Sequence, residues 1–103
     1  MSYQHILYEE TGEIGLLTLN RPAKRNALSR ACEEEIIACL EDAASRHAAK
    51  VIILRGAGEL FCAGHDRSEI LGQPAGEIRR LFHTSVKMMT TIRSAPQCVI
   101  AQV

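Results

Sequence analysis

The residues best suited to chemistry lie between Arg55 and Asp66, where the sequence reads RGAGELFCAGHD. An apolar run at 51–54 (VIIL) precedes them and predicts a buried strand, while residues 66–69 (DRSE) can open a helix. A strand that turns through glycines into a helix start directs unpaired backbone N–H groups at one point in space. Such a point suits an anion, or the oxyanion that develops on a reacting carbonyl.

Positive charge gathers upstream, in residues 20–28 (NRPAKRNAL). Arg21, Lys24, Arg25 and Arg30 fall within a stretch of ten residues, and phosphate groups are bound by side chains of this kind. Taken alone, such a run is also typical of a solvated loop. A phosphate-bearing ligand is therefore one of two interpretations of this segment.

The overall composition argues against several classes of partner. Twelve Lys and Arg balance twelve Asp and Glu in 103 residues, and two Tyr, two Phe and no Trp are few stacking rings for a nucleic-acid surface. No apolar stretch approaches the roughly 20 residues of a membrane span, and the first residues lack the basic and apolar regions of a signal peptide. We therefore expect one small domain in a cytoplasmic, reducing compartment, with no nucleic-acid or membrane partner.

The cysteines and histidines show no ligand spacing. The four cysteines (32, 39, 62 and 98) include no CxxC pair, and the four histidines (5, 47, 65 and 83) are equally scattered. Zinc sites depend on paired spacings, so we expect no metal. We favour free thiols over disulfides, since thiols on a helix usually behave as small buried hydrophobic groups.

The chain opens with a predicted β-hairpin. Residues 5–9 and 14–20 are strand-like, and the loop 10–13 between them holds Gly12, where a positive φ is expected. Pro22 ends the second strand because proline cannot donate to a ladder. Residues 23–28 then follow as a basic loop.

Two helices are predicted, at about 29–47 and 77–94. Ser29 is the expected N-cap of the first, and the glutamates at 33–35 are expected to form a solvated helix start. The second helix should end before Pro96 and should hold Met88 and Met89 as core residues. Its expected inward face consists of Ile78, Leu81, Phe82, Ser85, Met89 and Ile92.

An apolar strand at 98–103 follows the second helix. The order strand, helix, strand, helix, strand predicts an α/β fold with parallel pairing through right-handed crossovers, and the hairpin makes the sheet mixed. We expect Val99, Ile100 and Val103 to lie on an unprotected edge, where another chain can pair.

Three segments in this order resemble the enoyl-CoA hydratase/isomerase (crotonase) superfamily: residues 20–28 (NRPAKRNAL), 50–56 (KVIILRG) and 61–66 (FCAGHD). The resemblance extends to Pro96. It implies a crotonase-like spiral of ββα units, of which residues 1–103 are the N-terminal portion, and a homo-oligomer (a trimer or a hexamer) for the full protein. It also implies a bent acyl-CoA thioester as ligand, so that coenzyme A arrives with the substrate and no cofactor is bound permanently.

The resemblance also implies roles for particular positions. The backbone N–H of His65 matches the first of two oxyanion donors to a thioester enolate. Ala63 matches the position whose carbonyl contacts the adenine, and Asp66 is expected to cap a helix start rather than to act as a base. The residues matched to the substrate and coenzyme A loops are Lys24, Arg25, Ala27, Ala63, Gly64, His65, Asp66 and Arg67.

The function implied is that of an enoyl-CoA hydratase or isomerase. Histidine at position 65 resembles methylmalonyl-CoA decarboxylase-like proteins and hydratase-domain-containing proteins, so a malonyl-type decarboxylase is an alternative. In the family, the second oxyanion donor and the proton-transferring glutamates follow the region matched here, and Glu59 and Glu69 lie off the matched positions. We therefore expect the 103 residues alone to be inactive, which leaves a non-catalytic acyl-CoA-binding or assembly module as the third interpretation.

Overall fold

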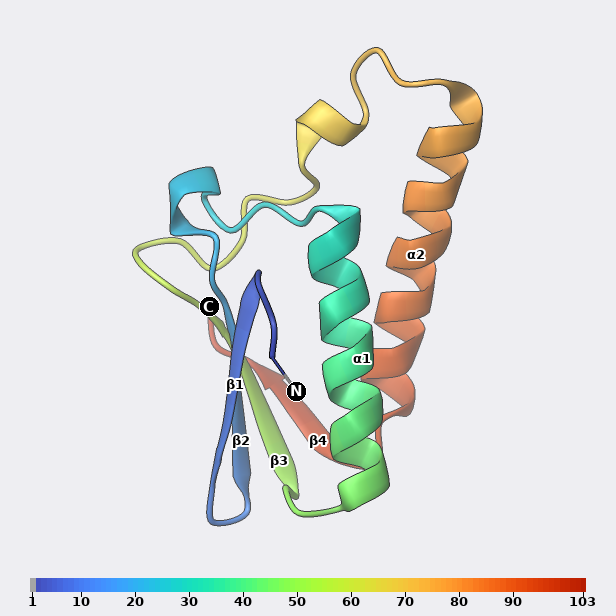
Figure 1. The fold of residues 1–103 in the computed structure, drawn as a ribbon. Helices are drawn as coiled ribbons and strands as arrows, with labels where there is room; N and C mark the ends of the chain where they lie inside the picture. Colours follow the sequence, from blue (N-terminus) through green and yellow to red (C-terminus); the bar gives the residue numbers. More distant parts are fainter. Residues whose placement is uncertain (1) are drawn as a thin grey trace.

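A computed structural model of the chain describes residues 2–103. A four-stranded mixed sheet is covered on one face by two long helices, α1 (Arg30–Arg46) and α2 (Ala75–Ser94) (Figure 1). The strands are β1 (Ile6–Thr11), β2 (Ile14–Leu19), β3 (Val51–Gly56) and β4 (Cys98–Ala101). The loops contain two single turns of 3-10 helix, η1 (Pro22–Lys24) and η2 (Arg67–Glu69).

The strands lie in the order β1-β2-β3-β4. β1 and β2 pair antiparallel, whereas β2 with β3 and β3 with β4 pair in parallel, which confirms the hairpin and the two crossovers. β1 extends to Thr11, beyond the predicted residue 9, because the turn needs only two residues and Gly12 accepts its positive φ of 61°. β4 ends at Ala101 rather than at residue 103.

The core lies between the sheet and the helices. Alternate side chains of the strands point to α1 and are buried, as the period of a strand requires. The largest fully buried hydrophobic side chains are Ile6, Leu17, Ile36, Leu40 and Ile52. α1 follows its N-cap Ser29, which accepts the N–H of Cys32 at 3.1 Å, and ends at Arg46 with His47 as its C-cap, so the predicted cap and the bounds of about 29–47 are confirmed.

The glutamates at the start of α1 do not form a solvated surface. Glu33 is fully buried under α2, and Glu35 accepts the backbone N–H of His5 at 2.8 Å. Glu34 alone of the three side chains is well exposed. The prediction for Glu33 and Glu35 is wrong because both are covered by segments distant in sequence, which a local helix pattern does not reveal.

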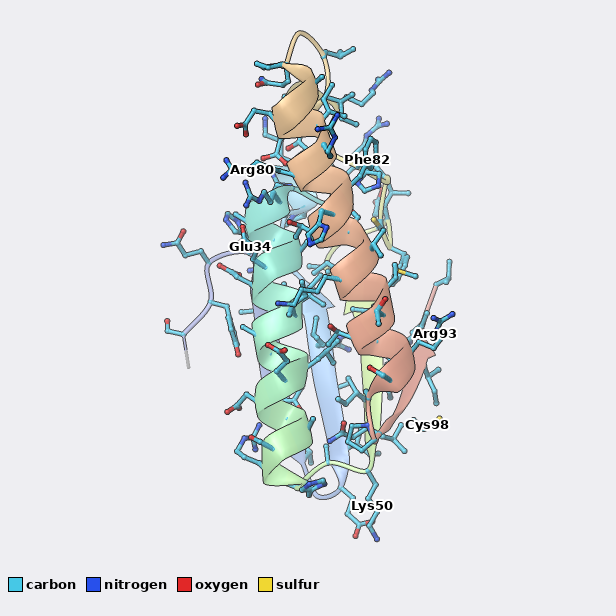
Figure 2. The ribbon with its side chains drawn as sticks, turned by 90° about the vertical axis from the view of Figure 1, so that its right-hand side faces the viewer. Glu34, Lys50, Arg80, Phe82, Arg93 and Cys98 are labelled. Carbon is cyan, nitrogen blue, oxygen red and sulfur yellow. The ribbon has the colours of Figure 1, made fainter. Side chains whose placement is uncertain are left out.

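α2 begins at Ala75, two residues before its predicted start, and only part of its predicted inward face is buried; Leu81 and Met88 are buried as predicted. Its buried side chains are Leu81, Thr84 and Met88. Phe82 and Met89 are 45% and 59% exposed, and Phe82 projects from the side of α2 away from α1 (Figure 2). The inward placement of these two residues is wrong because α2 carries two adjacent apolar stripes, and α1 packs against the other one.

The four cysteines are free thiols, as predicted. Burial raises the pKa of the Cys32 thiol to about 12 and that of Cys39 to about 11, so neither is a thiolate at neutral pH. Within residues 2–103, no helix has the length and apolar character needed to cross a membrane.

Candidate functional site

A buried asparagine joins the basic loop to the glycine-rich loop that follows β3. Asn26 donates through Nδ2 to the carbonyl oxygens of Ala57 (2.8 Å) and Leu60 (2.7 Å), and its Oδ1 accepts the N–H of Arg21 at 2.9 Å. Asn26 has a φ of 56°, a left-handed conformation that asparagine tolerates better than most residues. Our sequence reasoning missed this residue, and its only local signal was an asparagine in a turn.

The glycine-rich loop folds back tightly over the end of β3. A Cβ on Gly56 would lie 2.4 Å from the Phe61 carbonyl oxygen and 2.6 Å from that of Leu60, so no side chain fits there. Gly58 and Gly64 have φ values of 80° and 101°. The predicted tight loop is therefore confirmed, and its glycines are required by close approach and by backbone conformation.

A second link between the two loops runs from Arg21 to Asp66. The Arg21 guanidinium donates to the carbonyl of Ala27 and to Asp66 Oδ2, 3.2 Å away. Hydrogen bonds from Ser68 and from Arg21 hold the pKa of Asp66 below its usual value, and Asp66 caps η2 by accepting the Ser68 N–H. Asp66 is thus a cap, as expected, although of one 3-10 turn. Arg21 is already engaged in these bonds, so it is not free to bind phosphate as its place in the basic run suggested.

The backbone around His65 is fixed by Leu28. The Leu28 N–H donates to the carbonyl of Gly64 at 2.8 Å, and the Asp66 N–H donates to the carbonyl of Leu28 at 2.9 Å. In this parallel bridge the N–H and C=O of His65 itself face away from Leu28. No hydrogen bond among residues 2–103 uses the His65 amide, so this donor is unpaired within a held stretch of backbone.

The imidazole of His65 lies against the helices. Its ring meets the Phe82 ring edge-on, with centroids 5.6 Å apart, and its Nδ1 lies 4.0 Å from Glu33 Oε2. Glu33 in turn lies 2.8 Å from the hydroxyl of Ser85. Burial raises the pKa of Glu33, and the Ser85 hydrogen bond and His65 offset this only in part. No sequence pattern indicated this polar cluster, because its members come from three distant segments.

The remaining matched residues lie at the surface of the same two loops. Lys24 and Arg25 are exposed, and neither forms an ion pair within the described part of the chain. The Arg25 carbonyl accepts the N–H of Ala63 at 3.1 Å, which brings the loops side by side. Ala63 and Arg67 are exposed, and Ala27 is half-buried. A hollow of about 570 Å³ between the loops is lined by Pro22, Arg25, Asn26, Ala57, Glu59 and Leu60.

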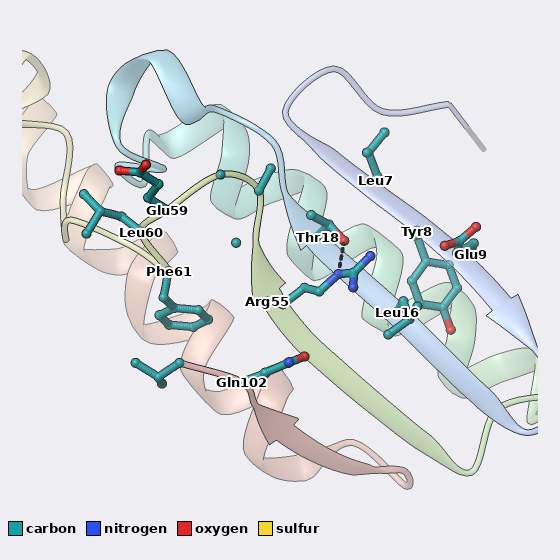
Figure 3. Close-up of a pocket in the computed structure, with 14 residues that line it drawn as sticks. Leu7, Tyr8, Glu9, Leu16, Thr18, Arg55, Glu59, Leu60, Phe61 and Gln102 are labelled. Carbon is teal, nitrogen blue, oxygen red and sulfur yellow. Dashed lines mark hydrogen bonds between the residues drawn. The ribbon is translucent and has the colours of Figure 1, made fainter.

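A second hollow, of about 750 Å³, lies on the face of the sheet that the helices leave open and shares Ala57, Glu59 and Leu60 with the first (Figure 3). Leu7, Leu16 and Phe61 contribute apolar surface to it, and Arg55 crosses it to donate to Thr18 Oγ1 at 3.1 Å. In residues 2–103, no three His, Cys, Asp or Glu side chains gather as metal ligands would. The matched loops therefore remain the candidate site.

Comparison with known proteins bears directly on these loops. The family model described as enoyl-CoA hydratase/isomerase matches residues 9–103. The chain belongs to this family. The resemblance seen in the sequence is therefore confirmed.

Two curated family members and one solved structure illustrate the relationship. The chain is 36% identical over 98 residues to enoyl-CoA hydratase domain-containing protein 3, mitochondrial, of Danio rerio, covering 94% of this chain and 34% of that protein. It is 32% identical over 96 residues to delta(3,5)-delta(2,4)-dienoyl-CoA isomerase, mitochondrial, of Mus musculus, covering 82% and 29%. The crystal structure of enoyl-CoA hydratase from Bacillus anthracis superimposes with a TM-score of 0.91 at 33% identity, covering 95% of this chain and 39% of that one.

These family members are longer than this chain. The chain spans about a third of the curated relatives and about two fifths of the solved structure. The predicted fold, an N-terminal portion of the crotonase type, is confirmed at this coverage. Both curated relatives are mitochondrial by name, and the cytoplasmic location inferred from composition stays a prediction.

Proposed function

We propose that this member of the enoyl-CoA hydratase/isomerase family binds an acyl-CoA thioester and stabilises its enolate through the backbone N–H of His65. The observation that carries the proposal is the state of this amide, which has no partner within residues 2–103 although its neighbours are bonded to Leu28. A donor already held in place needs no reorganisation when negative charge develops on the thioester oxygen. In comparable sites one such donor lowers the barrier by roughly 3–4 kcal/mol.

The coenzyme A moiety would lie along the basic loop. Lys24 and Arg25 are exposed and lack carboxylate partners in the described chain, so their charges are free for phosphate groups. In the proposed binding mode, the Ala63 carbonyl accepts a hydrogen bond from the adenine. Gly64, Asp66 and Arg67 border the acyl part of the ligand. Asn26 fixes the two loops relative to each other, which keeps the phosphate sites at a constant distance from the oxyanion donor.

For the reaction we propose hydration or isomerisation of an enoyl-CoA, in accord with the names of the relatives. Such turnover needs a second oxyanion donor and proton-transfer groups besides the His65 amide. We accordingly expect the 103 residues to bind acyl-CoA without turning it over. We further propose that the full protein is a homo-oligomer, as the family resemblance implies.

Calorimetric titration of the chain with coenzyme A and with crotonyl-CoA tests the binding proposal. Both ligands should bind, and crotonyl-CoA should bind more tightly because only it presents a thioester carbonyl to the His65 amide. Absence of heat at millimolar ligand would contradict the proposal. Assays of the full protein with crotonyl-CoA and methylmalonyl-CoA, side by side, test the reaction class: a rate above buffer with methylmalonyl-CoA alone would instead indicate a decarboxylase.

A further inference from the structure

We propose that Glu33 is a positioning residue of the acyl-CoA site, which acts through the side chain of His65 to hold the oxyanion amide in place. The cluster of Glu33, Ser85 and His65 is described by the structure itself, whereas its consequence for ligand binding rests on the proposed function. No motif that we recognised in the sequence involves Glu33 or Ser85.

The carboxyl group of Glu33 is buried within the protein. Its side chain has no exposed surface on a helix whose other buried side chains are mostly apolar. A buried carboxyl is costly unless its oxygens are hydrogen-bonded. The Ser85 hydroxyl lies 2.8 Å from Oε2, 3.0 Å from Oε1 and 3.1 Å from the carbonyl of Leu81. The Ser85 hydroxyl therefore donates to the Glu33 carboxyl and satisfies part of its hydrogen-bonding capacity.

The imidazole of His65 lies close to this buried carboxyl. The Nδ1 atom of His65 is buried, has no hydrogen-bond partner within residues 2–103, and lies 4.0 Å from Glu33 Oε2. A relative movement of ~1 Å brings these atoms to hydrogen-bond distance. One proton then lies between them, donated either by Nδ1 to the carboxylate or by the carboxyl to Nδ1. Glu69 also acts on Glu33 and raises its pKa, while Glu33 in turn raises the pKa of the Cys32 thiol.

The contact between Glu33 and the His65 side chain also restrains the backbone N–H of His65. Leu28 holds the backbone of residue 65 on one side, while Glu33 of α1 and Phe82 of α2 confine its side chain on the other. These restraints together leave the peptide plane that carries the His65 N–H little freedom to rotate. Loss of the Glu33 carboxyl removes the polar restraint, and the amide then points less well at a thioester oxygen.

The test compares Glu33→Gln and Ser85→Ala with a matched control, Glu34→Gln, which alters an exposed neighbour on the same helix. Each protein is titrated with coenzyme A and with crotonyl-CoA. The affinity for crotonyl-CoA divided by the affinity for coenzyme A reports the thioester contact, because the nucleotide part is common to both ligands. Glu33→Gln should reduce this ratio roughly fivefold, the effect of one ordinary hydrogen bond, and should leave coenzyme A affinity unchanged. Glu34→Gln should change neither.

A second measurement needs no ligand. The ring nitrogen resonances of His65, recorded by NMR, report which nitrogen carries the proton. They should shift in Glu33→Gln and, to a lesser extent, in Ser85→Ala, and they should not shift in Glu34→Gln. Identical ring resonances in the wild type and both cluster variants would overturn the inference. If Glu33→Gln fails to fold by circular dichroism, Ser85→Ala decides in its place.

The outcomes separate the inference from the proposed function. If the wild type binds neither ligand, the proposed function fails. The positioning role of Glu33 then fails as well, because there is no bound thioester for the amide to contact. The ring resonances of His65 would in that case report only whether the cluster of Glu33, Ser85 and His65 exists. If the wild type binds both ligands and Glu33→Gln weakens them equally, Glu33 is only structural and the inference fails alone. A selective loss of the crotonyl-CoA preference supports both.

Discussion

Asn26 satisfies the carbonyl groups of Ala57 and Leu60 and the amide of Arg21 at a position that is 1% exposed. Asn26→Ala leaves these buried groups without partners, so we expect the free energy of unfolding to fall by about 2–3 kcal/mol. Urea unfolding followed by circular dichroism measures the change. Asn20→Ala, at an exposed position six residues earlier, is the control. A loss for Asn26→Ala no larger than that of the control would show that these hydrogen bonds do not stabilise the loops.

Lys24 and Arg25 are the residues on which coenzyme A affinity should depend. Each replacement by alanine removes one charge from the phosphates, and we expect coenzyme A to bind roughly 3- to 10-fold more weakly, with a smaller dependence on salt. Calorimetry at two salt concentrations measures both effects. Lys87→Ala removes an exposed lysine from α2 and should leave the affinity unchanged. An equal loss in all three variants would point to net charge rather than to a defined phosphate site.

Prediction from sequence succeeds at the residue scale where the signal is local. Ser29 as a helix cap and Gly12 at positive φ both follow from neighbours a few positions away, and the structure has both. Asn26 and Glu33 were missed or misjudged because their partners lie about thirty to fifty residues away. A single polar residue does not show in advance which distant carbonyl or hydroxyl will meet it.

At the scale of the elements, Glu33 makes the packing of α1 on α2 dependent on pH. Burial raises the pKa of Glu33 above its ordinary 4.5, so the folded chain retains a proton that the unfolded chain has lost. Stability from this group is complete below pH ~4.5 and is lost as pH rises through the folded pKa. We expect urea unfolding of the wild type to show this decline as pH rises above 4.5, and Glu33→Gln, which has no ionisable proton, to lack it. Glu34→Gln should retain the decline; parallel pH profiles of the wild type and Glu33→Gln would contradict the assignment.

The phase of α2 shows how far a periodic pattern determines an element. The apolar spacing predicted the existence and the C-terminal end of this helix, and the structure has a helix that ends at Ser94. It did not determine the buried face, since the stripe with Leu81 and Met88 and the stripe with Phe82 and Met89 differ by one position. In the structure, α1 packs against the stripe with Leu81 and Met88. The polar pair Glu33–Ser85 lies in the same interface, and a pattern of apolar residues does not reveal it.

At the scale of the whole molecule, the arrangement of the sheet was the most predictable feature. Two crossovers of one hand after a hairpin leave few possible strand orders, and the order found, β1-β2-β3-β4, follows the sequence. The site was less predictable. The family resemblance gave the loops, whereas the bonds that hold them together, from Asn26 and from Arg21, emerged only from the folded structure.

The same arrangement leaves an open edge. β4 is the last strand of the sheet in residues 2–103; Ile100 on it is 48% exposed, and Val103 beyond its end is 97% exposed. Val99, which was also predicted to lie exposed on this edge, is instead partly buried against the core, because alternate side chains of a strand point to opposite faces. An exposed apolar edge strand pairs readily with another chain, so we expect the 11.3 kDa chain to form larger species at micromolar concentrations in light scattering. Ile100→Lys places a charge on the edge and should restore the monomer. Val86 lies on the outer face of α2 and is 65% exposed, so Val86→Lys is the matched control and should not restore the monomer. Dispersal by Val86→Lys alone would assign association to α2, and a monomer at all concentrations would show that the edge is not adhesive.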